Sequence, residues 1–382
     1  MSNNVRYHVS NVENSNATSS YGEFSSIDFV LNASGRKLVK NSIRIEADVV
    51  ITYNGNPLTT ANTVKIDNKL GGHVFWDSWS VTMPESKGLI QNGQEYGRYV
   101  KQIGAGSESQ NDVFSADMLA ELRGYDEQNG KINLEPSLAF SKQTAQADLD
   151  ASQEPVNFSI KPLICVNQMQ GDNYSFDKLG QIRLSANLAR NSKALFGRDI
   201  ATATPASYEL QNVVCRYMTI PDDGQQGKIL MNSYTMIKNS INSNNANISC
   251  KVPSNAVSSV TISFLESANE SSLTNNSYAL NRFPNFQELN YNFSDSTNQY
   301  ISYTITDQGD SQHKALEGLK SLGYDDINAN TYRANNGYLL GLDFNDQFTD
   351  LSRNKFSLNI KSKESNIPSL NVYLYFNSLL VI

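Results

Sequence analysis

The sequence has 382 residues, 39% of them hydrophobic and 18% charged, and a mean hydropathy of -0.44, which predicts a chain long enough for two ordinary cores. Its 31 basic and 38 acidic residues give a net charge of -7, and the scattered basic residues argue against sequence-specific nucleic-acid binding, since phosphates require clustered Lys and Arg. No apolar run reaches the ~18 to 20 residues of a membrane span, and the N-terminus lacks the apolar stretch of a signal peptide, so we expect a protein that is not secreted.

The N-terminal residues 1–20 are polar and low in complexity, and they predict a flexible arm that orders only on contact with a neighbouring molecule. The folded part is expected to begin near Phe24. Residues 27–31 alternate apolar and polar side chains, and residues 43–53 do so over a longer run. This alternation is typical of half-buried strands.

Another strand is predicted over residues 73–83, and it contains both tryptophans, Trp76 and Trp79. Large aromatic side chains usually act through buried area. We therefore interpret the tryptophans as core or inter-subunit packing rather than as a platform on which a carbohydrate stacks.

A short amphipathic helix that ends at Gly124 is predicted from a stripe of apolar residues, namely Phe114, Met118, Leu119 and Leu122. Gly104 and Gly106 precede this stripe, but the third glycine and the parallel strands of a nucleotide-binding loop are missing. Residues 125–154 are polar and weakly patterned, which predicts a surface insertion.

Strands are predicted again at residues 156–160 and 182–188, followed by a long strand over 208–220. The long strand has apolar residues on both alternations, which indicates burial on both of its faces. We expect it to be the last strand of the first half of the chain.

A turn and a helix are predicted over residues 222–243, where Asp222 and Asp223 can cap the segment that follows. The predicted helix would pack an apolar stripe, formed by Leu230, Tyr234, Ile237 and Ile241, against a neighbouring sandwich. We expect this segment to connect two domains.

The second half repeats this plan in fewer residues. Strands are predicted around residues 248–250, 260–264, 289–291, 301–305, 340–344, 356–360 and 372–376. A helix is expected to start near Asp310 or Ser311, with Leu316, Leu319 and Leu322 on one stripe, and to end at Gly323. The periodicity predicts an all-β protein with two consecutive antiparallel sandwiches and short inserted helices.

The sequence offers no cluster of titratable groups from which to build an active site, so we assign no catalytic, cofactor-binding or metal-binding residue and no cofactor. His8, His73 and His313 are isolated, and the paired acids such as Asp222 with Asp223 fall in segments typical of turns. Cys165, Cys215 and Cys250 lie in strand-like runs at irregular spacing and are interpreted as core residues.

Two binding or catalytic possibilities stay open on the residues alone. A calcium site at Asp343, Asn345 and Asp346 is conceivable, although the distal carboxylate and the glycine of an EF-hand loop are missing. A glycosidase with paired carboxylates is also open, because its two acids need only meet in space.

Several segments, taken in their order along the chain, resemble one known family. The run YELQNVVCRYMTI followed by PDDGQQGKILMNSYTMIKN is similar to the junction between the two domains of double jelly-roll major capsid proteins, and NVYLYFNSLLVI is similar to their closing strand. GYLLGLDFNDQF and RNKFSLNIKS resemble their penultimate strands, while LVKNSIRIEADVVITYNG and HVFWDSWSVTM resemble the early ones. The likeness covers most of residues 24–382.

The resemblance implies two consecutive eight-stranded jelly-roll sandwiches, with an N-terminal arm at 1–20, a first jelly roll at 21–221, a connection at 222–243 and a second jelly roll at 244–382. It implies a structural protein and not an enzyme, namely a capsid subunit of an icosahedral double-stranded DNA virus that forms homotrimers with a pseudo-hexagonal outline. Expected partners are neighbouring capsomers, penton and minor capsid proteins and, in some members, an internal membrane; the expected location is the virion.

Two other functions remain as alternatives to the capsid subunit, since one fold hosts many functions. The first is a tandem jelly-roll protein that binds a carbohydrate or a receptor, such as a spike or a lectin. The second is a carbohydrate-active enzyme built from two sandwiches. The assembly state of the purified protein separates all three.

Overall fold

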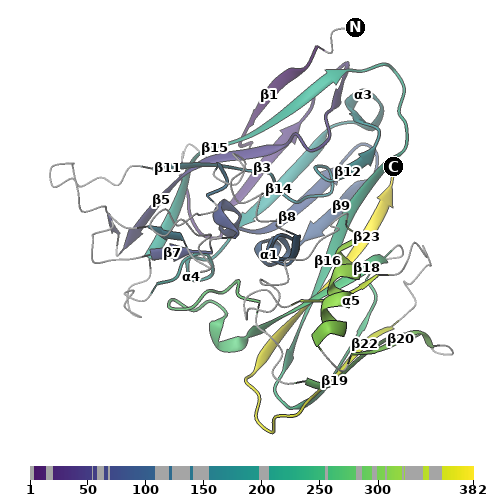
Figure 1. Ribbon diagram of the computed structural model, residues 1–382. Coiled ribbons are helices and arrows are strands. Elements are labelled where there is room, and N and C mark those ends of the chain that lie inside the picture. Colours follow the sequence, from purple (N-terminus) through teal and green to yellow (C-terminus); the bar gives the residue numbers. More distant parts are fainter. Residues whose placement is uncertain are drawn as a thin grey trace.

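The structure is a computed structural model, and it describes sixteen stretches of the chain. They are residues 4–13, 20–53, 55–57, 64–67, 69–107, 120–122, 138–140, 155–197, 206–253, 257–280, 286–294, 299–305, 308–320, 322, 339–343 and 355–382. Within them the chain forms two β-sandwiches, one above the other in Figure 1, with both termini in the upper part of the view.

The first sandwich contains two antiparallel sheets. In the larger one β11 (Val156–Ile160) pairs with β5 (Arg44–Tyr53), and β5 pairs with β15 (Ala206–Pro221). Further along β15, β4 (Arg36–Leu38) pairs with it and also with β13 (Tyr174–Ser175). Three further strands pair with members of this sheet: β1 (Arg6–Asn11) and β2 (Ser20–Tyr21) with β15, and β6 (Asn56–Pro57) with β5. The facing sheet has the order β3 (Ser26–Leu31), β14 (Ile182–Leu188), β8 (Trp76–Met83) and β9 (Gly88–Gly93).

The second sandwich has the same construction. One sheet runs in the order β12 (Met169–Gly171), β16 (Ile229–Ile241), β23 (Leu370–Val381), β18 (Val257–Glu266) and β21 (Leu340–Asp343), where β12 comes from the first half of the chain. The other sheet has the order β17 (Asn245–Lys251), β22 (Lys355–Ser362), β19 (Phe286–Ser294) and β20 (Gln299–Ile305). Without β12, four strands from each sheet give the eight strands expected for this sandwich.

The connectivity of the two sandwiches is identical once β1 is counted with β2, and β4 with β5, as single strands. In both sandwiches the last strand lies between the first and the third, and the seventh lies between the second and the fourth. The two sides of β15 are established by its register, because Arg216 is opposite Val9 of β1 and also opposite Arg44 of β5. A strand residue can have two such partners only across its two opposite edges.

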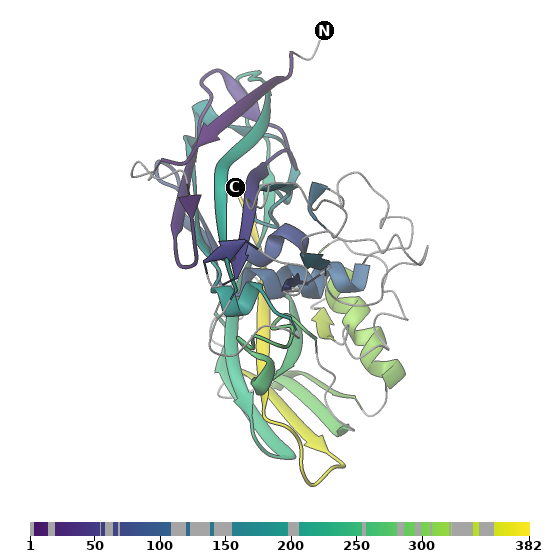
Figure 2. The same cartoon turned by 90° about the vertical axis from the view of Figure 1, so that its left-hand side faces the viewer.

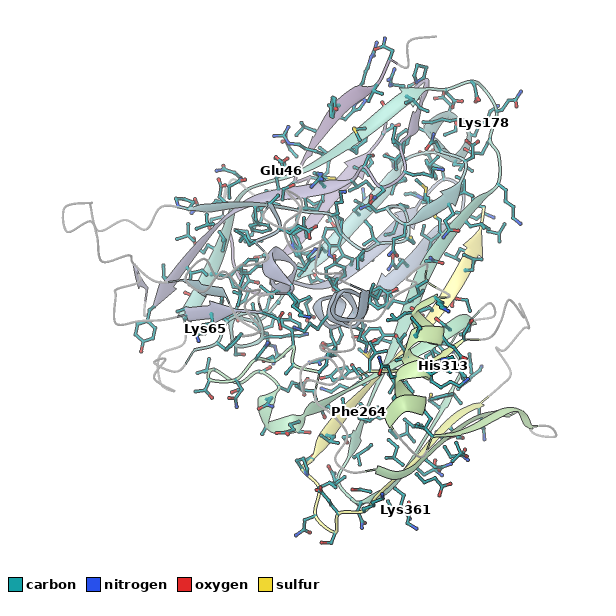
Figure 3. All side chains as sticks on the ribbon, in the orientation of Figure 1. Glu46, Lys65, Lys178, Phe264, His313 and Lys361 are labelled. Atoms are coloured by element: carbon teal, nitrogen blue, oxygen red, sulfur yellow. The ribbon has the colours of Figure 1, made fainter. Side chains whose placement is uncertain are left out.

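Alternating apolar residues fill each sandwich, as the period of two requires. In the first core Ile45, Val49 and Leu210 face Phe29 and Trp79, and all of them are almost fully buried. In the second core the rings of Phe356 and Phe376 meet edge to face with centroids 5.7 Å apart. Phe264 lies inside this lower sandwich in Figure 3, whereas Lys361 lies on its outside.

The helices are short and few in the described residues. They are α1 (Tyr96–Ser107), α3 (Phe176–Leu179), α4 (Asn191–Ala194), α5 (Gln308–Lys320) and the 3-10 turns η1 (Gly71–Phe75) and η3 (Ser267–Asn269). A small two-stranded sheet is formed by β7 (Val64–Ile66) and β10 (Leu138–Phe140). The longer helices α1 and α5 lie on one side of the stacked sandwiches (Figure 2).

The helix predicted within residues 222–243 is wrong. The segment forms the strand β16, which pairs with the C-terminal strand β23 along its whole length, from Leu230 opposite Val381 to Ile241 opposite Leu370. The apolar spacing suggested a helix because β16 contacts neighbours on both faces, so consecutive residues are buried and the period of two is lost. The turn at Asp222 and Asp223 is confirmed, since their carboxylates accept hydrogen bonds from Gly224 N and Gln225 N.

The flexible arm predicted for residues 1–20 is also wrong for the residues of β1 and β2. Arg6–Asn11 pairs with β15 residue by residue, and Ser20–Tyr21 pairs further along the same strand. The polar composition concealed this strand, because its apolar residues point outward and its inward side chains are His8 and Ser10. The domain limits at 21–221 and 244–382 stay a prediction.

The long strand β15 is buried on one face and not on both, because its residues alternate between buried and more exposed positions. The strands expected at 27–31, 43–53, 156–160 and 182–188 are confirmed as β3, β5, β11 and β14. In the second half α5 is confirmed, with Leu319 fully buried. The helix expected before Gly124 and most of the insertion at 125–154 lie outside the described residues.

Two truncations distinguish a strand from a helix at β16. Met231 is fully buried in the first core, whereas Leu230, part of the stripe of the predicted helix, is only half-buried. We expect Met231→Ala to lower the free energy of unfolding by about 2 to 5 kcal/mol and Leu230→Ala by roughly 1 kcal/mol. Urea denaturation of the two variants measures both values, and the reverse order would contradict the strand.

Candidate functional site: the junction between the two cores

Helix α1 lies beside the two sandwiches, at the level where they meet (Figure 2), and contributes to both cores. Tyr96 and Val100 belong to the first hydrophobic cluster, and Tyr99 and Ile103 belong to the second. These positions follow the i, i+3, i+4, i+7 spacing, so they form one stripe on the helix. The stripe faces two cores at once, and Figure 1 shows α1 nearly end-on at the centre of the molecule.

Polar residues of α1 are buried as well, and one of them is Lys101. Its ammonium lies 2.8 and 2.6 Å from the two carboxylate oxygens of Asp67, and the two side chains are 1% and 0% exposed. Asp67 also accepts hydrogen bonds from Leu70 N and from the amide of Asn276, at 3.2 and 2.6 Å. The ion pair therefore connects β7, α1 and a loop of the second half.

Arg98 is the second buried cation on α1. Its guanidinium donates to the backbone oxygens of Ser277 and Ala279 and lies over the ring of Tyr373, 4.1 Å from the centroid. Buried charges need partners that replace water, and carbonyl oxygens with an aromatic face provide them here. Arg98 thus attaches the loop after η3 and the strand β23 to the same helix.

Tyrosine rings complete the junction. Tyr99 stacks on Tyr234 of β16 with centroids 3.8 Å apart, and Tyr375 of β23 donates a hydrogen bond to Glu95 O. Tyr278 reaches back into the first half and donates to Val74 O at 3.1 Å. Its ring lies so close to Gly97 that a Cβ there would be 2.7 Å from the ring carbon Cε1.

A further ion-pair cluster lies beside α1. Lys193 of α4 contacts Asp77 of β8 and lies 2.8 Å from Glu95. Burial alone would raise the pKa of Glu95, but the nearby charges of Lys193 and Arg98 hold this pKa below its ordinary value. The charged carboxylate is therefore favoured, and its attraction to Lys193 and Arg98 stabilises the folded protein beside α1.

These contacts explain the arrangement as a structural joint. Lys101 pairs with Asp67 and Arg98 donates to backbone oxygens, and both cations are only 1% exposed, so neither is open to a substrate. Burial also raises the pKa of the thiols of Cys165 and Cys215, which makes them poor nucleophiles. They are core residues as predicted, while Cys250 is half-buried on β17.

Other residues considered from the sequence have structural contacts. Trp76 and Trp79 are fully buried, with ring centroids 5.0 Å apart, which confirms that they are core residues. His73 lies 2.8 Å from the hydroxyl of Tyr96, and Asp223 pairs with Lys37 at 2.8 Å. No group of three possible metal ligands occurs in the described stretches, from which Asn345 and Asp346 are absent.

Sequence reasoning missed this junction almost entirely. The stripe Tyr96, Tyr99, Val100 and Ile103 was the available signal for a helix, but the polar residues between them obscured it. The partners could not be identified, because Asp67 is 34 residues from Lys101 and Ser277 is 179 residues from Arg98. Such contacts depend on the fold of the whole chain.

Comparison with known proteins gives the fold. No known family model and no curated protein matches the sequence. VP54 of PBCV-1, in a crystal structure fitted into a cryo-EM reconstruction of the virophage Sputnik, matches with a TM-score of 0.56 at 10% identity, covering 100% of this chain and 95% of VP54. The fold is a double jelly roll.

Two further solved structures are similar over the same length. The major capsid protein of mavirus has a TM-score of 0.47 at 8% identity and covers 98% of this chain and 88% of its own. The major capsid protein P2 of bacteriophage PM2 has a TM-score of 0.37 at 8% identity and covers 98% of both chains. The fold match to VP54 confirms the resemblance to double jelly-roll major capsid proteins seen in the sequence. These neighbours are structural proteins and not enzymes.

Among the described helices of the double jelly roll, none combines the length and the apolar character that crossing a bilayer requires. The helix α1, at 12 residues, is too short and carries the buried cations described above. Its role is to join the two jelly rolls.

The buried pair on α1 gives a first prediction for the joint. Lys101→Met removes one partner and leaves Asp67 charged and buried, so we expect the free energy of unfolding to fall by about 3 to 5 kcal/mol. The matched control is Arg216→Met on the outer face of β15, where Arg216 is 51% exposed and pairs with Glu46, labelled in Figure 3. An exposed pair contributes about 1 kcal/mol or less, so equal losses in urea denaturation would contradict the joint.

Glu95 gives a second prediction, on pH. Because its pKa is lower in the folded protein than its ordinary value, its charge adds stability above that ordinary value. This stability is lost as the pH falls through the lowered pKa, below about 4.5. We expect Glu95→Gln to be less stable at pH 7 and to lose less stability between pH 5 and pH 3 than the wild type. Glu209→Gln, at an exposed carboxylate, should keep the wild-type pH dependence.

Proposed function

We propose that this chain is the structural subunit of an icosahedral viral capsid, which trimerises into pseudo-hexameric capsomers that tile the shell. The observation that carries the proposal is the whole-length match to VP54, a double jelly-roll capsid protein, with almost nothing unmatched in either chain. The proposal places the protein in the virion and makes other copies of the chain its main partners, with penton and minor capsid proteins as further ones.

The junction supports this function physically. Two similar jelly rolls in one rigid subunit give six similar units when three copies surround a three-fold axis, which is how a trimer acquires a hexagonal outline. Such a subunit must keep a fixed angle between its two halves if many copies are to meet in register. The contacts of Arg98 and the tyrosines around α1 fix that angle, because bending the junction would separate the buried guanidinium from Ser277, Ala279 and Tyr373 of the second half.

The two tryptophans give no support to a carbohydrate-binding function. A sugar-stacking platform requires exposed aromatic rings, and Trp76 and Trp79 are fully buried. A catalytic function would require titratable groups open to a substrate, and the charged residues of the junction are closed off by their partners.

The assembly state of the purified wild-type protein tests the proposed function. We expect native mass spectrometry to show trimers, and negative-stain electron microscopy to show particles with a hexagonal outline or closed shells. A protein that remains monomeric at high concentration, in buffers of low and moderate ionic strength, would contradict the capsid function. Glycan binding by such a monomer would favour the lectin alternative.

A further inference from the structure

The strand β1 and the residue before it expose an unusual amount of apolar surface. Val5 is 41% exposed, Tyr7 80% and Val9 51%, and these are three of the six large apolar side chains that the described chain exposes. They alternate with Arg6 and His8, so all three point to the same outer face of the sheet. A stripe of this kind at a sheet border is typical of a contact surface.

The backbone of β1 has an open edge beside this stripe. Its register with β15 runs from Arg6 opposite Thr219 to Asn11 opposite Val214, and within the described residues β15 is the only strand that pairs with it. Figure 1 shows β1 at the border of the upper sandwich. Edge strands usually carry lysine, proline or a bulge that prevents pairing with another chain. β1 has none of these and contains Arg6 as its one charged residue.

The second jelly roll shows that this position can be covered. Its first strand, β16, occupies the place that β1 has in the first jelly roll, and its outer edge pairs with β12 through Ile229 to Met231. β16 also packs against β9, where Ser233 donates a hydrogen bond to Ile90 O. The equivalent edge in the first jelly roll has no such cover among the described residues.

We propose that the outer edge of β1 pairs with the same edge of a second copy of this chain, antiparallel and around a two-fold axis at Tyr7. In this register Tyr7 is opposite Tyr7 of the second copy, and Val5 is opposite Val9 of the second copy. The spacing of the three residues makes the edge complementary to itself, which identifies the partner as another copy. Aromatic and β-branched residues opposite each other are favourable cross-strand pairs.

The charges on the other face of β1 permit this pairing. The register puts Arg6 opposite His8 of the second copy. Burial, together with the positive charges of Arg36 and Arg6, lowers the pKa of His8, so the imidazole is neutral at pH 7. No like-charge pair therefore opposes the contact at neutral pH.

The symmetry of this contact assigns it a place in the shell, which rests on the proposed function. A two-fold contact joins identical surfaces, whereas the contacts within a trimer join different surfaces of successive subunits. The β1 edge is therefore not the trimer interface. It links one trimer to the next by a sheet that continues across both.

Cysteine cross-linking tests the register directly. In Tyr7→Cys the two thiols face each other across the axis, at the roughly 4.5 to 5.5 Å between Cα atoms of an antiparallel pair, which suits a disulfide. We expect most Tyr7→Cys chains to form linked dimers under mild oxidation, as seen on non-reducing gels. Tyr7 is 80% exposed, so the substitution does not endanger folding.

Val9→Cys is the matched control, on the same face of the same strand. In the proposed register the two residues at position 9, one from each copy, are about 13 Å apart along the strands. This is beyond the reach of a disulfide, so the yield of linked dimers should stay as low as in the wild type. Equal linkage of the two variants, or linkage of neither, would overturn the proposal. Cys165 and Cys215 are buried, so the background of the wild type comes from the half-buried Cys250, which both variants share.

A charge substitution separates this inference from the proposed function. We expect Tyr7→Lys to keep the trimer in native mass spectrometry but to lose shells or larger assemblies in electron microscopy. The control is Leu89→Lys on β9, at a residue that is 60% exposed, and it should retain both. Shells formed by Tyr7→Lys as well as by the wild type would overturn the β1 contact and leave the capsid function standing. A wild type without trimers would overturn the capsid function, and the cysteine test in solution would still decide whether the β1 edges pair.

Discussion

The rest of the structure depends on the partners that replace water around the buried charges of α1. Lys101 and Arg98 are removed from water almost completely, and each would be very costly to bury alone. Their partners come from distant segments: Asp67 follows β7, and Ser277 and Ala279 follow η3 in the second half. These segments must reach α1 for either charge to be tolerated. The requirement ties the loops of both jelly rolls to one short helix and makes the two cores a single body.

The strands reinforce this connection by crossing from one half to the other. β12 belongs to the first half but extends the sheet of the second, and Ile229 and Met231 of β16 belong to the first hydrophobic cluster. Lys37 stabilises the turn between β15 and β16, because its ammonium contacts both Asp172 and Asp223. The two jelly rolls are therefore joined at a helix, at a sheet edge and at a turn. A subunit with three such attachments resists bending between its halves.

The sequence predicted the strands well where one face is buried and the other is exposed, as in β5, where Ile45, Ala47, Val49 and Ile51 are buried in alternation. It failed where local pattern and environment disagree. β16 lies against neighbours on both faces, so its apolar residues follow no period of two. β1 points its apolar residues outward and its polar residues inward, so its pattern does not match that of a half-buried strand. The junction could not be predicted, since the hydrogen bonds from Asn276 to Asp67 and from Arg98 to Ser277 join residues far apart in the sequence, from both halves of the chain.

The shared connectivity of the two jelly rolls gives a physical reason why the chain can both fold and assemble. In each jelly roll the first strand pairs with the last, which leaves the outer edge of that first strand as the place where further backbone can be added. The second jelly roll uses this edge within the chain, through β12, and so attaches itself to the first. In the first jelly roll the equivalent edge is the outer edge of β1, and three exposed apolar side chains lie beside it. One topological position thus serves twice, once to join the two halves of a subunit and once to join one subunit to another.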